Sequence, residues 1–186
     1  MHSQTITVHT MLDGKHFTDF ANFDIFKLRK RHIKPILFCL ILTAFSILCF
    51  ILNNGKNQGS LLGTVLLIIA IGLPAVYFGL YFRSLGYQVK QMRLSKPRLV
   101  YTLELSDPDD GIHTIERPDP RFASGTDTEH TYKWSEAYGA FRRKDVIYLY
   151  VSDKQAYIIP DGQADSAPEF VWSFISSHID SSKVHG

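Results

Sequence analysis

The stretch KLRKRHIKPILFCLILTAFSILCFIL, residues 27–52, decides the fold, because a cluster of basic residues leads directly into an apolar run. Residues 35–55 contain no charged side chain over 21 positions, and residues 57–82 contain none over 26. A bilayer core about 30 Å thick is crossed by about 20 apolar residues in a helix that rises about 1.5 Å per residue. Both windows are long enough, so the sequence predicts two membrane spans.

The predicted transmembrane hairpin occupies residues 35–82, with spans at about 35–52 and 61–82. One alternative is a buried pair of core helices in a soluble protein. Such helices normally keep a polar stripe toward solvent, whereas apolar residues here cover every face. The other alternative is a cleaved signal peptide, but the apolar run begins beyond the usual first stretch of about 15–30 residues. We therefore favour membrane spans over both alternatives.

The distribution of basic residues predicts the orientation of the hairpin. Lys and Arg near the ends of a span stay on the cytoplasmic side of the membrane. Five of them precede the first span, five follow the second, and only Lys56 lies in the connector at residues 53–60. The five before the hairpin, which we call the basic collar, are Lys27, Arg29, Lys30, Arg31 and Lys34, and the five after it are Arg83, Lys90, Arg93, Lys96 and Arg98. We predict a multi-pass protein of the cell membrane with both termini in the cytoplasm, in which the spans and the basic collar contact membrane lipids.

Small residues mark one face of the second span. Gly72, Ala75 and Gly79 recur at helical spacing, and small side chains let two membrane helices approach closely. We prefer packing of this face against the first span, with the seam of a homodimer as the alternative. Cys39 and Cys49, the only cysteines, lie ten residues apart in one helix, about 15 Å along its axis, which is too far for a disulfide.

The segments that flank the hairpin are predicted to be ordered. Residues 1–34 hold a short strand, in which Ile6 and Val8 alternate with polar residues, followed by an interfacial helix that carries the basic collar. Residues 83–97 are predicted to extend the second span as a polar helix. This helix should end at or near Lys96, because a proline follows.

Residues 98–181 are predicted to form a cytoplasmic β-rich domain. Apolar side chains alternate with period two from residue 98, turn residues follow at 107–111, and a long loop is expected at 118–130. The expected strands are RLVYTLELS (98–106), IHTIER (112–117), the region of Tyr132 and Trp134, residues 138–141, DVIYLYV (145–151) and QAYIIP (155–160).

The final segment SAPEFVWSFISSHI, residues 166–179, predicts an amphipathic helix. Ser166 and Glu169 have the spacing of a capping box at its start. Short antiparallel strands closed by such a helix predict a small antiparallel β-barrel or roll. The predicted fold class is therefore an α+β membrane protein, with a two-helix transmembrane hairpin and a β-barrel or roll closed by a C-terminal helix.

A resemblance to a known family rests on the order of these segments. Two spans behind a basic helix, then a β-rich domain with YKW at residues 132–134 and AYIIP at residues 156–160, resemble the YcxB-like family. These are small bacterial membrane proteins, and the resemblance, which covers nearly the whole chain, implies a pleckstrin-homology-like fold for the C-terminal domain. Family members often place a basic residue after that proline, whereas this chain has Asp161. The resemblance implies no particular activity and carries over no functional residue.

Motifs typical of catalysis and metal binding are absent from the sequence. It has no glycine-rich phosphate loop, no nucleophile elbow and no HExxH motif. His9, Asp13 and His16 lie near one another, but without a further ligand they do not predict a metal site. The acidic turn at residues 107–110 resembles half a calcium-binding loop but lacks the closing glutamate. We predict no catalytic, cofactor-binding or metal-binding residues, no cofactor and no enzyme activity.

The two halves of the chain carry opposite charge. Residues 1–98 hold 12 Lys and Arg against 3 Asp and Glu, a net charge of +9, and residues 99–186 hold 8 against 15, a net charge of −7. An acidic domain repels phosphate, so nucleic acid and phosphoinositides are poor partners for it. The cluster Arg142, Arg143 and Lys144 is the one basic patch that could overturn this expectation.

These observations predict a membrane-anchored cytoplasmic interaction module that binds a protein or peptide partner and performs no catalysis. The open edges of a small sheet suit capture of a peptide by strand addition, and an acidic surface suits a basic partner. One alternative is an accessory subunit of a transporter or channel, which is less favoured because neither span contains an ionisable side chain. The other alternative is an immunity protein of the membrane, which protects its own cell.

Overall fold

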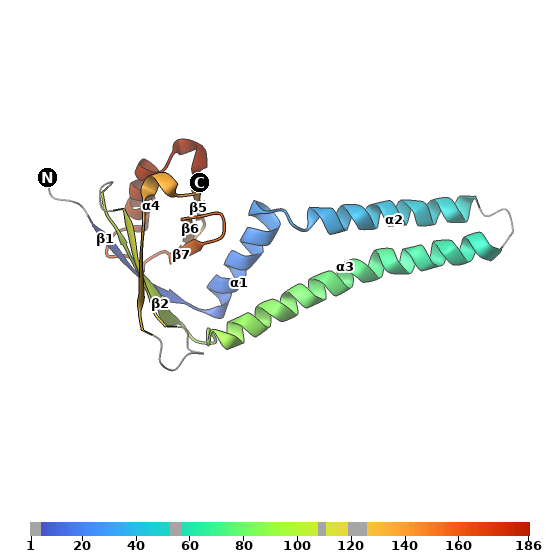
Figure 1. Ribbon diagram of the computed structural model, residues 1–186, viewed down its shortest axis with the longest axis horizontal. Helices are drawn as coiled ribbons and strands as arrows, with labels where there is room; N and C mark the ends of the chain where they lie inside the picture. Colours follow the sequence, from blue (N-terminus) through green and yellow to red (C-terminus); the bar gives the residue numbers. More distant parts are fainter. Residues whose placement is uncertain (1–4, 53–56, 108–110, 119–125) are drawn as a thin grey trace. The chain divides into compact units, whose positions relative to one another are not determined.

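A computed structural model of the chain describes residues 5–52, 57–107, 111–118 and 126–186 (Figure 1). The chain divides into two compact units. Met1–Phe20 and Val89–Gly186 form the first, which we call the β unit, and Ala21–Gln88 form the second, which we call the hairpin unit. Helices and sheets are both present, so the predicted α+β class is confirmed.

Two long helices, α2 (Ile33–Ile51) and α3 (Asn57–Gln91), make up most of the hairpin unit and lie side by side (Figure 1). Both are long and apolar enough to cross a membrane. Only 11% of the most apolar part of each helix is buried, whereas an apolar core helix of a soluble protein is mostly buried. Length, composition and exposure therefore agree with the two predicted spans. Residues 53–56 of the predicted connector lie outside the described residues.

The two helices meet at Gly63 of α3. The Ser46 hydroxyl is buried and donates a hydrogen bond to the Gly63 carbonyl oxygen at 2.6 Å. A Cβ at this glycine would lie 3.0 Å from the Phe50 ring, so the small residue permits the approach. At Gly72 or Gly79, by contrast, a Cβ would meet no atom of the described residues within 4 Å. The prediction that the face with Gly72, Ala75 and Gly79 packs against the first span is wrong, because the two helices are in contact at Gly63 instead. The alternative, that this face is the seam of a homodimer, stays a prediction.

The segment before α2 is not one continuous α-helix. A short π-helix, η1 (Phe23–Leu28), continues α1 (Gly14–Asn22) and carries the first residue of the basic collar. Phe26 packs against Phe78 and Tyr81 of α3, with ring centroids 6.0 and 5.8 Å away. These aromatic contacts fix η1 to α3 within the hairpin unit.

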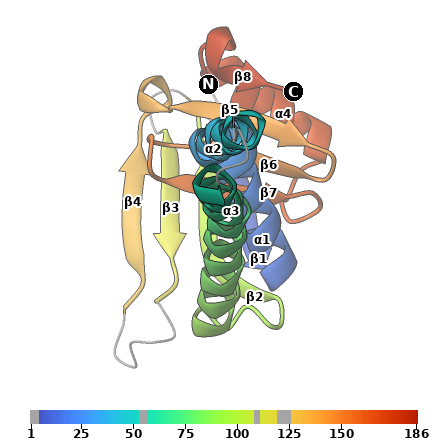
Figure 2. The ribbon, with the colours of Figure 1, turned by 90° about the vertical axis from the view of Figure 1, so that its right-hand side faces the viewer.

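The β unit contains two four-stranded sheets, and the first has the strand order β1–β2–β3–β4 (Figure 2). It is antiparallel throughout. Its strands are β1 (Ile6–Leu12), β2 (Arg98–Leu105), β3 (Ile112–Glu116) and β4 (Thr128–Tyr132). Val8 pairs with Leu103, and both side chains are fully buried, as the period-two pattern predicts. The N-terminal strand is therefore part of the same sheet as the segment that follows the hairpin.

The second sheet has the order β7–β6–β5–β8, and only the β5–β8 pair is parallel. Its strands are β5 (Gly139–Arg143), β6 (Val146–Tyr150), β7 (Ala156–Pro160) and β8 (Val184–His185). All five residues of β6 are buried, which makes this strand the centre of the core. The predicted turn residues 108–110, and residues 119–125 of the predicted loop, lie outside the described residues.

Of the predicted barrel or roll, a closed barrel is wrong for the described part of the chain. The strands form two separate sheets, and no strand of one pairs with a named strand of the other. Closure would require β1 or β4, the edges of the first sheet, to pair with the second sheet. The outer side of β1 instead forms an isolated bridge between Val8 and Ala164.

The C-terminal helix α4 (Pro168–His178) buries Val171, Phe174 and Ile175 of the predicted apolar stripe, whereas Phe170, which was expected to be buried with them, is exposed. The predicted capping box is wrong, because the N-cap residue is Ala167 and no side chain caps the helix. The Ser166 hydroxyl donates instead to the Asp165 carboxylate at 3.2 Å. The fixed backbone of a proline in the first turn favours this helix start without a side-chain cap.

The sequence predicts a strand at Trp134, but this prediction is wrong. Trp134 begins a short 3-10 helix, η2 (Trp134–Glu136), directly after β4. Its indole Nε1–H donates to the Ser106 carbonyl oxygen at 2.8 Å, and its ring lies 6.1 Å from the Phe174 ring. The indole thus links the end of β2 to α4 and closes one end of the core.

The helix after the second span is shorter than predicted. α3 ends at Gln91 rather than near Lys96. Arg93 adopts a left-handed conformation with φ of 53°, and the Leu94 N–H donates to the Val89 carbonyl oxygen at 3.0 Å. Such a left-handed residue with a backward hydrogen bond is a common way to end a helix.

Candidate interaction surface and pocket

The β1 edge of the first sheet is covered by a segment from elsewhere in the chain. The His9 N–H donates to the Gln163 carbonyl oxygen at 3.0 Å, and the Met11 N–H donates to Gln163 Oε1 at 2.7 Å. The Asp165 N–H donates to the Thr7 carbonyl oxygen at 3.0 Å. Backbone groups that an edge strand normally leaves unpaired therefore have partners along β1.

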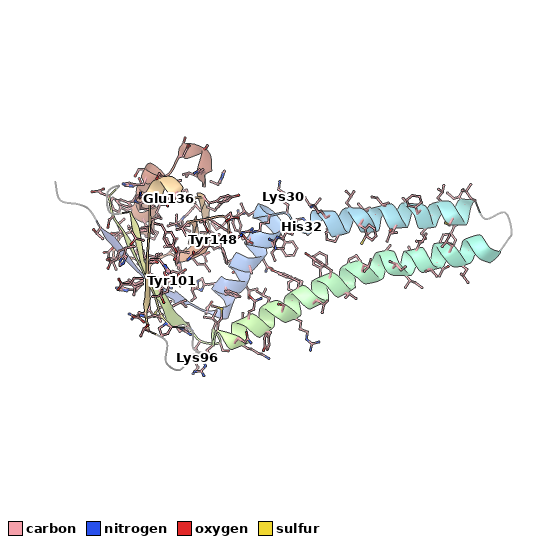
Figure 3. All side chains as sticks on the ribbon, viewed as in Figure 1. Lys30, His32, Lys96, Tyr101, Glu136 and Tyr148 are labelled. Atoms are coloured by element: carbon pink, nitrogen blue, oxygen red, sulfur yellow. The ribbon has the colours of Figure 1, made fainter. Side chains whose placement is uncertain are left out.

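The β7 edge of the second sheet is covered at one residue by a tyrosine of the first sheet. The Tyr101 hydroxyl donates to the Ile158 carbonyl oxygen at 2.8 Å and accepts from the Ile158 N–H at 2.5 Å. Tyr101 is 7% exposed and lies among the strands of the β unit (Figure 3). Burial raises the pKa of its phenol, so the hydroxyl keeps the proton that it donates. One hydroxyl here takes the place of a neighbouring strand.

The β4 edge of the first sheet is open in the described structure. β4 lies at the outside of the sheet, with β3 on its inner side (Figure 2). Four of its five residues are exposed, and β3 is the only strand that pairs with it among the described residues. Alternate residues of such a strand point their N–H and C=O groups away from the sheet. These groups are available to a further strand.

Acidic side chains surround β4. On the outer face of the sheet, His113 Nδ1 lies 3.3 Å from Glu104 Oε2, and His113 Nε2 lies 3.7 Å from Glu129 Oε2. Arg117 forms an ion pair with Asp127 just before β4. The carboxylates of Glu104 and Glu129 on this face favour a basic over an acidic partner.

The charge of the β unit as a whole is also negative. It contains 13 Lys and Arg against 17 Asp and Glu, a net charge of −4, whereas the hairpin unit contains 7 against 1, a net charge of +6. The β unit is less acidic than the −7 of residues 99–186, because residues 1–20 and 89–98 add five basic and two acidic residues to it.

A pocket of about 520 Å³ opens within the β unit. It lies between the start of β2, residues 116–118 at the end of β3, residues 126–128 at the start of β4, and the start of β7. Its lining residues are Met92, Leu94, Arg98, Val100, Tyr101, Glu116, Arg117, Pro118, Thr126, Thr128, Gln155, Ala156 and Tyr157. Its volume lies in the usual range of small-molecule sites, about 300–1,000 Å³.

Tyr157 organises the polar wall of this pocket. Its hydroxyl donates to Glu116 Oε1 at 2.9 Å and accepts from Gln155 Nε2 at 2.9 Å. The Thr114 hydroxyl lies 3.2 Å from the same oxygen, and the Tyr101 ring lies 5.0 Å from the Tyr157 ring. Burial raises the pKa of the Tyr157 phenol, and the nearby Glu116 carboxylate acts in the same direction. The Tyr157 hydroxyl is therefore a fixed, protonated donor that orients Glu116.

The residues weighed as metal ligands do not come together. His16 Nδ1 lies 2.8 Å from Asp13 Oδ1. The backbone N–H of His16 donates to the same oxygen at 2.8 Å, and this hydrogen bond is the main cause that lowers the pKa of Asp13. His9 instead contacts the Thr102 hydroxyl at 3.3 Å. Within the described residues, no group of three His, Cys, Asp or Glu side chains has the arrangement of a metal site.

The basic cluster at the β5–β6 turn is partly neutralised. Arg142 Nη1 and Nη2 donate to the two carboxylate oxygens of Asp161 at 2.6 and 2.7 Å. Asp161 is the residue that stands where family members often have a basic one. A guanidinium that is paired with a carboxylate attracts an anionic surface less strongly. The cluster should therefore bind anionic lipid more weakly than its three basic residues alone would indicate.

The pocket residues were missed by the sequence analysis, which named no site residue. Arg98 was counted only as a flanking charge of the hairpin, and Glu116 only as the end of a strand. These residues and Tyr157 come from three separate strands, β2, β3 and β7. No spacing within the sequence could have joined them.

Two sheets with a terminal helix, and a pair of helices that could cross a membrane, define the class: an α+β protein with a candidate membrane hairpin. Residues 109–170 match the model of a family described as YcxB-like protein. The resemblance found in the sequence is thereby confirmed over 62 of the 186 residues, which include Glu116 and Tyr157 of the pocket. No curated protein and no solved structure matches the chain.

Proposed function

We propose that the chain is a membrane-anchored interaction module that captures a basic peptide segment of a partner protein by adding it as a strand to β4, without catalysis. The observation that carries the proposal is the difference between the sheet edges. β1 is covered by residues 163–165, and β7 is largely buried and is covered at Ile158 by Tyr101. β8 is only two residues long, whereas β4 is exposed and pairs only with β3 among the described residues.

Strand addition supplies affinity through the backbone and selectivity through side chains. The outward N–H and C=O groups of β4 would pair with an extended peptide, as a further strand of the sheet would. Glu129, an exposed residue of β4 itself, favours a Lys or Arg beside it on that peptide. A basic segment is therefore the best match to this edge.

The hairpin unit anchors this module in the cell membrane, with both termini in the cytoplasm. The length and apolar composition of α2 and α3 support two spans. β1 precedes α2 and β2 follows α3, yet the two strands pair in one sheet, which requires both ends of the hairpin to lie on the same side. The basic collar and the basic residues after the second span favour the cytoplasmic side, where the collar meets anionic lipid headgroups.

The β unit is a pleckstrin-homology-like domain that serves a peptide rather than a phosphoinositide. The two sheets, the C-terminal helix and the family match support this kinship. Its net charge of −4 argues against binding of polyanionic headgroups. The hairpin unit pairs with a second copy through the open face at Gly72 and Gly79, which the space around both glycines supports.

Hydrogen exchange on the full chain in lipid nanodiscs tests the peptide proposal. The probes are two nine-residue peptides, one alternating Lys with Val and the other alternating Glu with Val. We expect the basic peptide to slow exchange of the β4 amides without changing that of the β1 amides, and its affinity to fall as salt rises.

Two charge variants make the test specific to the edge. Glu129→Lys, on β4, should weaken binding of the basic peptide several-fold, whereas Glu136→Lys, an exposed residue of η2, should leave it unchanged. Equal binding of both peptides, or protection that appears only outside β4, would refute strand addition at this edge.

A further inference from the structure

The pocket of the β unit presents one cationic and one anionic side chain, each with only neutral partners. Arg98 donates to the Met92 and Pro118 carbonyl oxygens at 3.3 and 3.4 Å and forms no ion pair with a described residue. Glu116 accepts from Tyr157 and from Gln155 and likewise forms no ion pair with a described residue.

The second arginine of the pocket is not equivalent to Arg98. The Arg117 guanidinium is neutralised by Asp127. Arg98 is held only by two long hydrogen bonds to uncharged oxygens, so its positive charge remains available to a ligand. The pocket therefore has one available charge of each sign.

The two available charges are set apart by the register of the sheet. Glu116 pairs with Tyr101. Arg98 pairs with Leu12, only two residues beyond the partner of Tyr101 on β1, because β2 carries an extra residue at a β-bulge there. Arg98 therefore lies roughly 7 Å along the strand from Glu116, on the same face of the sheet. The space between them is part of the pocket, and much of its lining is apolar, including Met92, Leu94 and Val100.

We propose that this pocket binds a small zwitterion with an apolar body, of the size of an apolar dipeptide, whose carboxylate pairs with Arg98 and whose ammonium group pairs with Glu116. A simple anion would be repelled by Glu116, and a simple cation by Arg98. A neutral ligand would leave both charges without a counterion in a partly dry site. Only a ligand with both charges matches the two residues and the apolar lining together.

This site goes beyond the proposed capture of a peptide at β4, because it is a pocket that binds through side chains rather than through strand pairing. Tyr157 acts as a positioning residue, since its hydroxyl holds the Glu116 carboxylate in the pocket wall. The described residues thus offer two binding sites of different chemistry, one for an extended chain and one for a small molecule.

Calorimetric titration of the full chain in detergent with leucylphenylalanine tests the proposal. Two capped forms serve as matched ligands: the N-acetyl form lacks the ammonium group, and the C-terminal amide lacks the carboxylate. We expect the free dipeptide to bind about tenfold or more tightly than either form, since a hydrogen bond to a charged group contributes roughly 1.5–3 kcal/mol.

Variants then assign each charge to its residue. Arg98→Gln should abolish the preference for carboxylate over amide and keep the preference for the free ammonium, and Glu116→Gln should do the reverse. Arg117→Gln, whose charge is already paired, should keep both preferences.

Three results would overturn the proposal: no binding of the free dipeptide, equal binding of the free and capped forms, or equal loss for all ligands in both variants. The comparison of ligands on the unaltered chain decides the matter even if a variant fails to fold. Glu129→Lys at the β4 edge should leave dipeptide affinity unchanged, which separates this site from the peptide edge.

Discussion

Removing the buried Tyr101 hydroxyl should destabilise the β unit far more than removing an exposed tyrosine hydroxyl would. In Tyr101→Phe the ring keeps its packing, but the Ile158 N–H and C=O lose their shared partner. Ile158 is 4% exposed, so water does not readily replace the hydroxyl. An unsatisfied buried polar group costs about 1–3 kcal/mol, and two such groups give an expected loss of about 2–6 kcal/mol.

The expected loss is large enough to measure by heat unfolding. A loss of 2 kcal/mol alone lowers the midpoint of a domain of about 100 residues by roughly 8–16 °C. Near-ultraviolet circular dichroism of the full chain in detergent reports on the aromatic core of the β unit. The Ile158 amide should also exchange its hydrogen faster in the variant.

Tyr138→Phe is the matched control, because this tyrosine lies in the same unit and is 49% exposed. It should leave the unfolding midpoint nearly unchanged. If Tyr101→Phe is as stable as this control, and the Ile158 amide stays protected, then the hydroxyl does not close the β7 edge and the reasoning is refuted.

Three further predictions follow from the same structure. Burial raises the pKa of Tyr148 to about 12, so this tyrosine loses its proton at lower pH in the unfolded chain than in the folded one. The free energy of unfolding should therefore fall as the pH rises from about 10 toward 12. An ultraviolet titration in which every tyrosine ionises near pH 10 would contradict this. A fragment of residues 98–181 lacks β1 and should not fold. A chain in which a glycine-serine linker replaces residues 21–88 keeps β1 and should show the circular dichroism of the folded β unit. A well-folded fragment would show that β1 is dispensable. Asn54→Cys in a cysteine-free background should react with an impermeant maleimide on intact cells, and labelling only after lysis would overturn the proposed orientation.

Where side chains alternate regularly, the sequence alone was sufficient to find the strands. Leu103 and its neighbours in β2 carry a period of two, and the turn that follows them fixes the hairpin partner β3. The two long helices could be predicted from composition, since an apolar window of about 20 or more residues without a charge is typical of a membrane-spanning helix.

Features that depend on distant partners could not be predicted. Trp134 reads as a strand residue, and only the Ser106 carbonyl oxygen that its indole contacts explains the 3-10 helix. Ser166 has the right spacing for a cap, but its hydroxyl donates a hydrogen bond to the neighbouring Asp165 carboxylate instead. Local pattern gives the periodicity of an element, whereas its ends are set by contacts from elsewhere in the chain.

The pocket shows the same limit for function. Arg98 and Glu116 are ordinary charged residues in their own segments, and only the register of β2 and β3 brings them to one wall. The open edge at β4 was foreseen as a general property of small sheets. Which edge is open became clear only from the hydrogen bonds that cover β1 and β7.

The pairing of β1 with β2 has a consequence for how the chain is made. The ribosome must produce the 85 residues between Leu12 and Arg98 before β1 can meet its partner, which takes about 4–17 s at roughly 5–20 residues per second. During that interval β1 has no sheet to join, while both long helices leave the ribosome. The sheet can close only if the two ends of the hairpin emerge in the same compartment. If the hairpin spans the membrane as proposed, a chain with only one helix inserted cannot close this sheet, and β1 stays without its partner strand.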